Sequence, residues 1–212
     1  MSHWAIDHSE TPIRLFKSDF LEFFTHISPI TVTIIWLPLA VFFFVRGIVL
    51  KPDQVSIFYM LAGFLIGIFL WSLAEYLLHR FVFHYKPKNA WQERVTFLFH
   101  GIHHVQPQCK TRLVMPPVVS VPLAFLFYGL FYLVCGVWLG AAYWVNPLVS
   151  GFIVGYLTYD LTHYSTHHLP SRSPWGKALK RQHMLHHFKT PDMRFGVSSP
   201  LWDYVFGTMP AD

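Results

Sequence analysis

Histidine is the residue type whose spacing in this chain points most directly to chemistry. Eleven of the fourteen histidines fall into four short clusters. Imidazole is the commonest neutral metal ligand near pH 7, and a structural zinc ion is saturated by about four ligands. So many clustered histidines therefore predict two metal ions. The clusters read HRFVFH (His79–His84), HGIHH (His100–His104), HYSTHH (His163–His168) and HMLHH (His183–His187).

The spacing inside the clusters predicts helices that direct histidines toward metal. Residues three or four apart share one helical face, so His100 can act with His103 or with His104. Adjacent histidines such as His103 and His104 diverge by about 100° around the axis and are suited to different ions. His79 and His84 are five residues apart. They either serve different ions or lie where the helix unwinds.

The ligand count predicts a catalytic centre and leaves the metal open. Ten of the eleven clustered imidazoles, shared equally by two ions, would give each ion five ligands and leave one octahedral position of each free. An open position distinguishes catalytic from structural sites. Imidazole suits iron, zinc, copper and nickel alike. A haem or a transport site is disfavoured, because both need ligands at the depth of the membrane spans.

The rest of the chain is typical of a membrane protein. Of its 212 residues, 53% are hydrophobic and 13% are charged, against about 25% charged in soluble domains. Residues 27–45, 55–74 and 113–159 contain no charged residue, and the third run is long enough for two spans. We predict an all-α polytopic protein with four transmembrane helices and a cytoplasmic histidine-rich helical cap. The membrane domain is 27–212, with spans at about 27–45, 55–78, 116–136 and 142–162 and a cap from 79–115 and 163–212.

Lysine and arginine predict the orientation of these spans. Fourteen of the sixteen fall before the first span, between the second and third, or after the fourth. By the positive-inside rule both termini and all four histidine clusters are cytoplasmic. This asymmetry explains the net charge of +5, so no nucleic-acid partner is predicted. Residues 1–26 are expected to form an interfacial segment, with an amphipathic helix from Thr11 that packs on the membrane or on the protein itself.

Three further residues are predicted to support the ligands. Glu75 lies one turn before His79, and Asp160 lies one turn before His163. Carboxylates commonly orient the histidines that bind metal. His168, at the end of its cluster, is expected to support the site and not to bind the ion.

The motif set HX4H, HX2HH, HX3HH and HX2HH on such a scaffold resembles the fatty acid hydroxylase superfamily, which includes sterol desaturases and carotenoid hydroxylases. Within it, the chain is most similar to the fatty acid 2-hydroxylases. The first box and the RLVMPP sequence favour that branch, because sterol desaturases more often have a shorter first box. The supporting stretches are Glu75–His84, Phe99–Pro107, Arg112–Pro117, Tyr159–His168, His183–Phe188 and Phe195–Thr208.

This resemblance implies two iron ions, which zinc can replace in purified protein, and activation of O₂ with two electrons from outside. The implied function is an integral membrane di-iron monooxygenase that hydroxylates a lipid acyl chain at position 2. A sterol or carotenoid hydroxylase or desaturase of the same superfamily is the alternative, followed by a non-catalytic zinc-held protein that binds lipid. The implied ligands are His79, His84, His100, His103, His104, His163, His167, His183, His186 and His187.

The resemblance also bears on the partner and the membrane. Fungal and animal members carry a cytochrome b5 domain at the N-terminus, and 26 residues before the first span are too few for one. The electron donor is therefore expected to be separate, either cytochrome b5-like or a ferredoxin with its reductase. The same difference favours the bacterial inner membrane over the endoplasmic reticulum. The mouth of the acyl site is expected at Arg112, Trp202, Asp203 and Tyr204.

Overall fold

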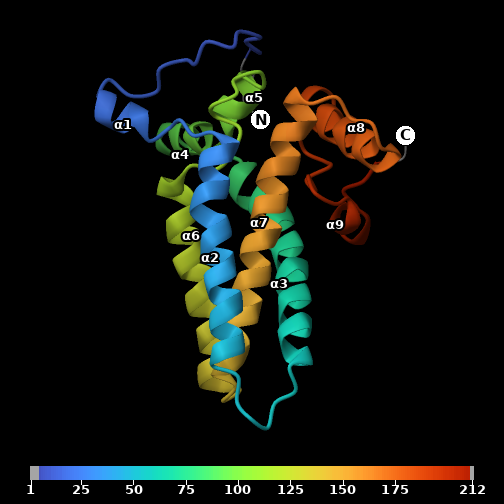
Figure 1. Ribbon diagram of the computed structural model, residues 1–212. Helices are drawn as coiled ribbons and strands as arrows, with labels where there is room; N and C mark the ends of the chain where they lie inside the picture. The colour runs from blue at the N-terminus through green and yellow to red at the C-terminus, as the bar shows by residue number, and fades with distance from the viewer. Residues whose placement is uncertain (1–4, 211–212) are drawn as a thin grey trace. The chain divides into compact units, whose positions relative to one another are not determined.

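Every regular element in residues 5–210, the part of the chain that the computed structural model describes, is a helix (Figure 1). The predicted all-α class is therefore confirmed. The chain divides into two compact units. We call Pro29–Trp71 with Met115–Thr158 the apolar unit. We call Met1–Ser28 with Ser72–Val114 and Tyr159–Asp212 the histidine unit.

The apolar unit is made of long helices. It contains α2 (Pro29–Val49), most of α3 (Phe58–Leu77), α6 (Pro117–Phe131) with the π-helix η3 (Tyr132–Trp138), the 3-10 turn η4 (Ala142–Trp144) and the first part of α7 (Val145–His168). Among the residues that the structure describes, three helical segments are long and apolar enough to cross a membrane, namely Pro29–Val49, Phe58–Phe83 and Pro117–Trp138. They coincide broadly with the first three predicted spans.

The fourth predicted span falls within α7. This helix has 24 residues, which exceeds the roughly 20 residues needed to cross the hydrocarbon core. It is nevertheless not among the three segments that combine length with high hydropathy, because it carries Asn146, Asp160 and several histidines. Four membrane crossings therefore stay a prediction.

Helices α3 and α7 approach closely in the apolar unit because glycines line their contact. A Cβ atom added to Gly151 would lie 1.9 Å from the carbonyl oxygen of Phe64, and one added to Gly67 would lie 2.2 Å from that of Leu148. Small residues at such contacts allow the backbones of membrane helices to pack directly. The ring centroids of Trp71 and Phe152 lie 5.0 Å apart at the same contact.

The histidine unit is built from shorter helices. It contains α1 (Asp19–Phe23), the end of α3, the π-helix η1 (Leu78–Phe83), α4 (Ala90–Thr96), the π-helix η2 (Phe97–Gly101), α5 (Ile102–Val105), the end of α7, α8 (Pro174–Phe188) and α9 (Leu201–Val205). Side-chain caps begin three of these helices, namely α1 at Ser18, α4 and α8. Asn89 accepts a hydrogen bond from the backbone N–H of Gln92 at 2.9 Å, and Ser173 accepts one from Gly176 at 3.0 Å, just before Pro174.

The amphipathic helix expected from Thr11 is not formed, and only Asp19–Phe23 is helical in this region. The reason is that side chains bind the backbone groups that a helix would use. The carboxylate of Glu22 accepts the N–H groups of Leu15 at 2.9 Å and Phe16 at 2.8 Å. The apolar periodicity of the sequence is real, but these contacts outweigh it.

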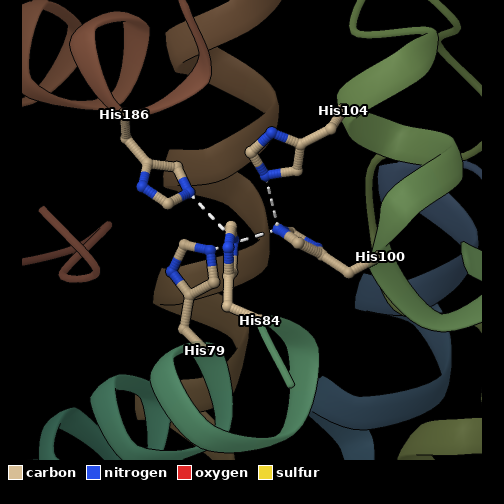
Figure 2. Close-up of side chains that lie close together, drawn as sticks. All are labelled: His79, His84, His100, His104 and His186. Atoms are coloured by element: carbon tan, nitrogen blue, oxygen red, sulfur yellow. Dashed lines mark hydrogen bonds between the residues drawn. The ribbon is translucent and has the colours of Figure 1, made fainter. Parts of the chain in front are cut away.

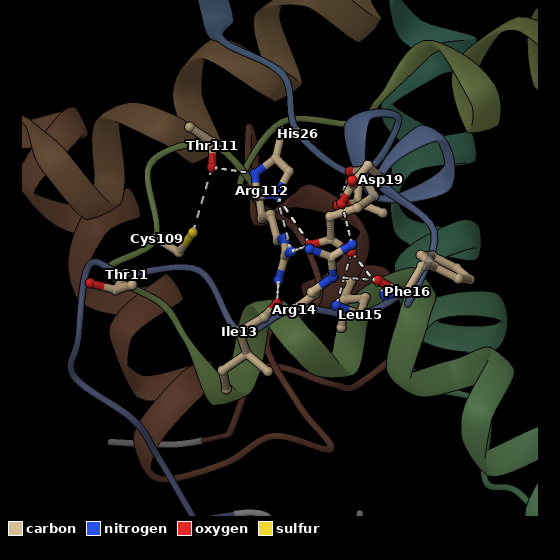
Figure 3. Close-up of polar contacts among 12 residues, drawn as sticks. Thr11, Ile13, Arg14, Leu15, Phe16, Asp19, His26, Cys109, Thr111 and Arg112 are labelled. Carbon is tan, nitrogen blue, oxygen red and sulfur yellow. Dashed lines mark hydrogen bonds and ion pairs between the residues drawn. The ribbon is translucent and has the colours of Figure 1, made fainter.

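Two side chains of the loop after α5 hold the same segment, residues 7–18, which we call the N-terminal strap. Gln106 accepts a hydrogen bond from the N–H of Ile13 at 2.8 Å and donates to Asp7 at 2.7 Å. Arg112 donates to the carbonyl of Ile13 (Figure 3). It also forms an ion pair with Glu22. Of the two predicted alternatives for this segment, the strap thus packs on the protein itself.

Candidate metal centre

The ten histidines that the resemblance implies come together in two groups of five. Within each group one ring nitrogen of every histidine lies within 4.8 Å of the others. Figure 2 shows the rings of the first group pointing toward one another from three separate parts of the histidine unit. The first histidine cluster is His79, His84, His100, His104 and His186; the second is His103, His163, His167, His183 and His187.

Helical geometry divides the histidines between the clusters. His100 and His104, four residues apart, approach within 3.1 Å through their Nε2 atoms in the first cluster. His183 and His187 approach within 3.0 Å in the second. The neighbours His103 and His104 go to different clusters, as their divergence around the helix axis predicts. His100 and His103, although three residues apart, also belong to different clusters.

A π-helix explains the five-residue spacing of the first pair. His79 and His84 belong to the same cluster, and the segment between them is η1. The N–H of His84 donates to the carbonyl of His79 at 3.0 Å, which closes the wider turn of a π-helix. Each residue of such a turn pairs five positions on. The helix therefore widens at this point, and both rings reach the same face.

Backbone carbonyls orient two histidines of the first cluster. The Nδ1 atom of His79 donates to the carbonyl of Phe195 at 2.5 Å, and that of His186 donates to the carbonyl of Met193 at 2.7 Å. These bonds place the proton on Nδ1 and leave the lone pair of Nε2 directed at the cluster centre. Because Nε2 of His79 lies 3.1 Å from that of His100, the converging lone pairs fit a bound cation.

Burial keeps these imidazoles neutral, as metal binding requires. Loss of solvent, followed by the charge of neighbouring histidines, lowers the pKa of His104 and that of His186 to about 3. The same causes lower the pKa values of His100 and His187 well below the ordinary value of 6.5. An all-imidazole donor set that is neutral, buried and convergent fits iron, zinc, copper or nickel.

Two buried carboxylates hold the loop that carries the Phe195 carbonyl. Asp203, fully buried, accepts the backbone N–H groups of Phe195 and Gly196, each at 2.8 Å, and the hydroxyl of Thr208 at 2.7 Å. A Cβ atom at Gly196 would lie 2.1 Å from the carbonyl oxygen of Ser199. This position therefore requires glycine for the loop to close around the carboxylate.

Glu75 binds the second half of the same loop. Its carboxylate accepts the N–H groups of Val197 at 2.7 Å and Ser198 at 2.8 Å, and the hydroxyl of Ser198. We call residues 195–198, whose four successive N–H groups bind two carboxylates, the 195–198 loop. Glu75 thus contacts this loop, and the loop in turn contacts His79.

The two other residues predicted to support the ligands lie beside the clusters. Asp160 is fully buried one turn before His163. His168 lies outside both clusters, and its ring centroid is 4.9 Å from that of Tyr164.

The residues predicted to shape a substrate mouth have different positions. Arg112 is buried and binds the N-terminal strap. Asp203 is fully buried under the 195–198 loop. Both therefore lie in the interior, where their hydrogen bonds are internal, and their part in shaping a substrate mouth stays a prediction. Trp202 is half-buried and donates to Ser72 at 3.0 Å, and Tyr204 is exposed.

The sequence did not reveal the carbonyl groups of Met193 and Phe195, because every residue has such a group and spacing does not single one out. It also gave no reason to select Gln106. The only available signal was a polar side chain directly after the HGIHHV stretch, where the structure buries it almost completely.

Comparisons with known proteins agree with this geometry. A family model described as fatty acid hydroxylase matches residues 64–208. The dihydroceramide fatty acyl 2-hydroxylase FAH1 of Arabidopsis thaliana is 40% identical over 98% of this chain and 84% of its own length. The human fatty acid 2-hydroxylase is 37% identical over 97% of this chain and 59% of its own length.

A solved structure has the same fold. The structure of full-length Scs7p, in which only the hydroxylase domain is visible, matches with a TM-score of 0.81 and 35% identity. The match covers 91% of this chain and 70% of that one. The curated relatives come from a plant, mammals and yeasts, so they give no support to the expected bacterial inner membrane.

Proposed function

Because this chain belongs to the fatty acid hydroxylase family, we propose that it uses O₂ at a di-iron centre to hydroxylate position 2 of a lipid acyl chain. One observation carries the proposal. Ten buried histidines form two convergent clusters of five in a chain that is 40% identical to a dihydroceramide fatty acyl 2-hydroxylase.

We propose that each cluster holds one iron ion through the Nε2 atoms that converge in it. Five imidazoles per ion leave one octahedral position open, which a catalytic site needs. When bound, the iron pair supplies the activation of O₂ that allows oxygen to enter an unactivated C–H bond. The chain supplies the geometry in which that chemistry occurs.

The chain's own groups act on the centre in three ways. The carbonyl of Met193 fixes the ring orientation of His186, and that of Phe195 fixes the ring orientation of His79. Such hydrogen bonds also make the imidazole a more basic ligand. Glu75 holds the 195–198 loop, which carries the carbonyl of Phe195. Burial of the clusters excludes bulk water, which limits loss of reducing equivalents to side reactions.

An apolar cavity supports an acyl chain as the substrate. The apolar unit contains a cavity of about 310 Å³ lined by α2, α6 and α7, with Trp36, Phe43, Phe127 and Phe152 among the lining residues. This volume falls in the range of about 300–1,000 Å³ that is usual for ligand pockets. An aliphatic chain is the ligand that such a lining favours.

We propose a multi-pass arrangement in which α7 is the fourth span and the histidine unit is cytoplasmic. Three segments with spanning length and hydropathy support it, as does the concentration of lysine and arginine on one predicted side. The oxidation requires two electrons for each O₂, so the proposal includes an electron-donor protein as partner.

The test is mass spectrometry of total acyl chains from cells that produce this protein together with cytochrome b5 and its reductase. We expect a new 2-hydroxy fatty acid from the wild type. His104→Ala should abolish the product, whereas the control His8→Ala, an exposed histidine outside both clusters, should retain it. A sterol or carotenoid product, or full activity in His104→Ala, would contradict the proposal.

A further inference from the structure

The end of the π-helix η1 borders a cavity with more positive than negative charge in its lining. The cavity has a volume of about 280 Å³ and lies in the histidine unit, where η1 and the residues after it meet the loop that follows α8. We call it the η1 cavity. Its lining includes Arg80, Phe81, His84, Lys86, Asp192 and Phe195. It therefore adjoins the first histidine cluster through His84 and carries two cations against one carboxylate.

The Arg80 guanidinium is held in place without being neutralised. Its carbon atom lies 5.0 Å from the ring centroid of Phe81 and 5.9 Å from that of Phe195. One N–H group of Arg80 donates to the hydroxyl of Tyr76 at 2.8 Å. In the part of the chain that the structure describes, neither Arg80 nor Lys86 forms an ion pair with a carboxylate. Because a guanidinium has five N–H donors, Arg80 keeps donors for an anion in the cavity.

The position of Arg80 along its helix places this charge at the level of lipid headgroups. Arg80 lies close to the end of Phe58–Phe83, a segment of 26 residues with the length and hydropathy of a membrane span. At 1.5 Å per residue such a segment is about 39 Å long. This length exceeds the hydrocarbon core of roughly 30 Å and reaches into the headgroup layers. Arginine and lysine near the ends of spans direct their charge toward those layers.

Helix α9 places apolar side chains beside the same region. Phe206, directly after α9, stacks on Tyr76 with ring centroids 5.2 Å apart. Trp202 donates to Ser72 at 3.0 Å, so α9 packs on the end of α3. Its one charged residue, Asp203, is buried, and its exposed side chains are therefore apolar or aromatic. We call six exposed side chains of these segments the apolar strip: Leu77, Phe81, Val82, Leu201, Tyr204 and Val205.

We propose that the η1 cavity binds the phosphate group of an anionic phospholipid and that the acyl chains of this lipid lie along the apolar strip. Arg80 and Lys86 supply the positive charge, and a guanidinium can bind two phosphate oxygens at once. Because Asp192 offsets one of the two cations, a lipid with a single negative charge is sufficient. Basic pockets beside membrane helices bind lipid headgroups in this way. The lipid undergoes no reaction here, so the inference does not depend on the proposed hydroxylation.

Two other anionic ligands fit one part of this surface but not all of it. Free phosphate would bind Arg80 and Lys86 and leave the apolar strip exposed. An acidic protein segment would also meet the cations, but it would have to cover apolar side chains that adjoin a membrane span. A lipid matches both the cationic cavity and the apolar strip at the level of the headgroups, and the observations therefore favour it.

The experiment counts the lipids bound to the full chain in neutral detergent micelles by native mass spectrometry. The probe is phosphatidylglycerol, which carries one negative charge, and phosphatidylcholine with the same acyl chains is the comparison without net charge. The variant Arg80→Gln with Lys86→Gln removes both cations of the cavity. Its matched control, Lys88→Gln with Arg94→Gln, removes two exposed cations that do not line the cavity.

We expect the wild type to bind one phosphatidylglycerol more tightly than phosphatidylcholine, and the double variant to bind it at least about tenfold more weakly. A lysine or arginine near an anionic lipid surface strengthens binding roughly fivefold, so the loss of two should exceed tenfold. The control should bind like the wild type. Lys86→Gln alone changes an exposed side chain and should weaken binding roughly fivefold, which tests the site even if replacement of Arg80 disturbs the fold.

Four results would overturn the proposal. They are equal binding of the two lipids, unchanged binding by both cavity variants, equal weakening by the control, and displacement of the lipid by a soluble anion. Displacement by inorganic phosphate at the concentration of the lipid would indicate an anion site that needs no lipid. Displacement by a poly-glutamate peptide would assign the cavity to an acidic protein segment. Binding requires neither metal nor turnover, so a failure of this proposal leaves the proposed function standing, and the converse also holds.

Discussion

Replacement of Asp203 by Asn should destabilise the 195–198 loop with little change in volume. The carboxylate accepts the N–H groups of Phe195 and Gly196 and the hydroxyl of Thr208. An amide has one acceptor oxygen, so its NH₂ group must face at least one of these donors. A buried N–H left without a partner costs about 1–3 kcal/mol, and a lost charge-assisted bond costs a further 1.5–3 kcal/mol or so.

Together these costs give about 2.5–6 kcal/mol for Asp203→Asn. In a chain of this length about 1 kcal/mol corresponds to roughly 2–4 °C, so the melting temperature should fall by roughly 5–24 °C. Thermal unfolding in detergent, followed by tryptophan fluorescence, measures this shift. Hydrogen exchange at the amides of Phe195 and Gly196 should accelerate in the variant.

The loop also carries the carbonyl that orients His79, so the variant should bind metal less tightly at the first histidine cluster. Changes to groups that orient ligands typically cost 10–100-fold in metal affinity. The matched control is Asp192→Asn, an exposed aspartate close by in sequence, which should melt and bind metal like the wild type. A shift below about 2 °C in Asp203→Asn, with unchanged exchange at Phe195 and Gly196, would refute the reasoning.

Three other perturbations test separate parts of the structure. Gly151→Leu should prevent close packing against the Phe64 carbonyl, 1.9 Å from the added Cβ, and cost at least about 3 kcal/mol; a melting temperature equal to that of the wild type would contradict this. Although partial burial opposes it, hydrogen bonds from Phe16 and Leu15 and the charge of Arg112 lower the pKa of Glu22 below 4.5. A lowered pKa means that the ionised carboxylate stabilises the strap above pH 4.5 and ceases to do so as pH falls through the folded value. Hydrogen-exchange protection at Leu15 should follow this change and be independent of pH in Glu22→Gln. Removal of metal by a chelator should lower the melting temperature, and ferrous iron at 1,000 times its Kd should restore about 4 kcal/mol; a melting curve insensitive to both would argue against a bound metal.

Much of the metal centre follows from the sequence because it depends on local helix geometry. The separation of His103 from His104 needs only the 100° step between neighbouring residues. The clustering of histidines beyond apolar runs also follows from residue order alone. These features are fixed by the covalent chain and require no knowledge of its tertiary contacts.

The remaining features depend on contacts between distant segments. The apolar pattern from Thr11 is correct as a pattern, but Gln106 and Glu22 bind the backbone of the strap and prevent a helix. Likewise, Asp203 carries no local sign that it lies beneath a loop and not at a surface. A side chain that binds backbone groups far away in sequence has no periodicity from which its role can be inferred.

The π-helix between His79 and His84 shows that a longer spacer in a wider helix can place two histidines on one face, as a shorter spacer does in an α-helix. A chain with one residue fewer between these histidines could direct both at the same ion from an ordinary α-helix, because i and i+4 share a face. Deletion of Val82 would therefore convert the π-helical turn into an α-helical one and keep the rings of His79 and His84 on the same face. Histidine boxes of unequal length can thus encode one coordination geometry, and the number of intervening residues then reports the winding of the backbone and not the arrangement of the ligands.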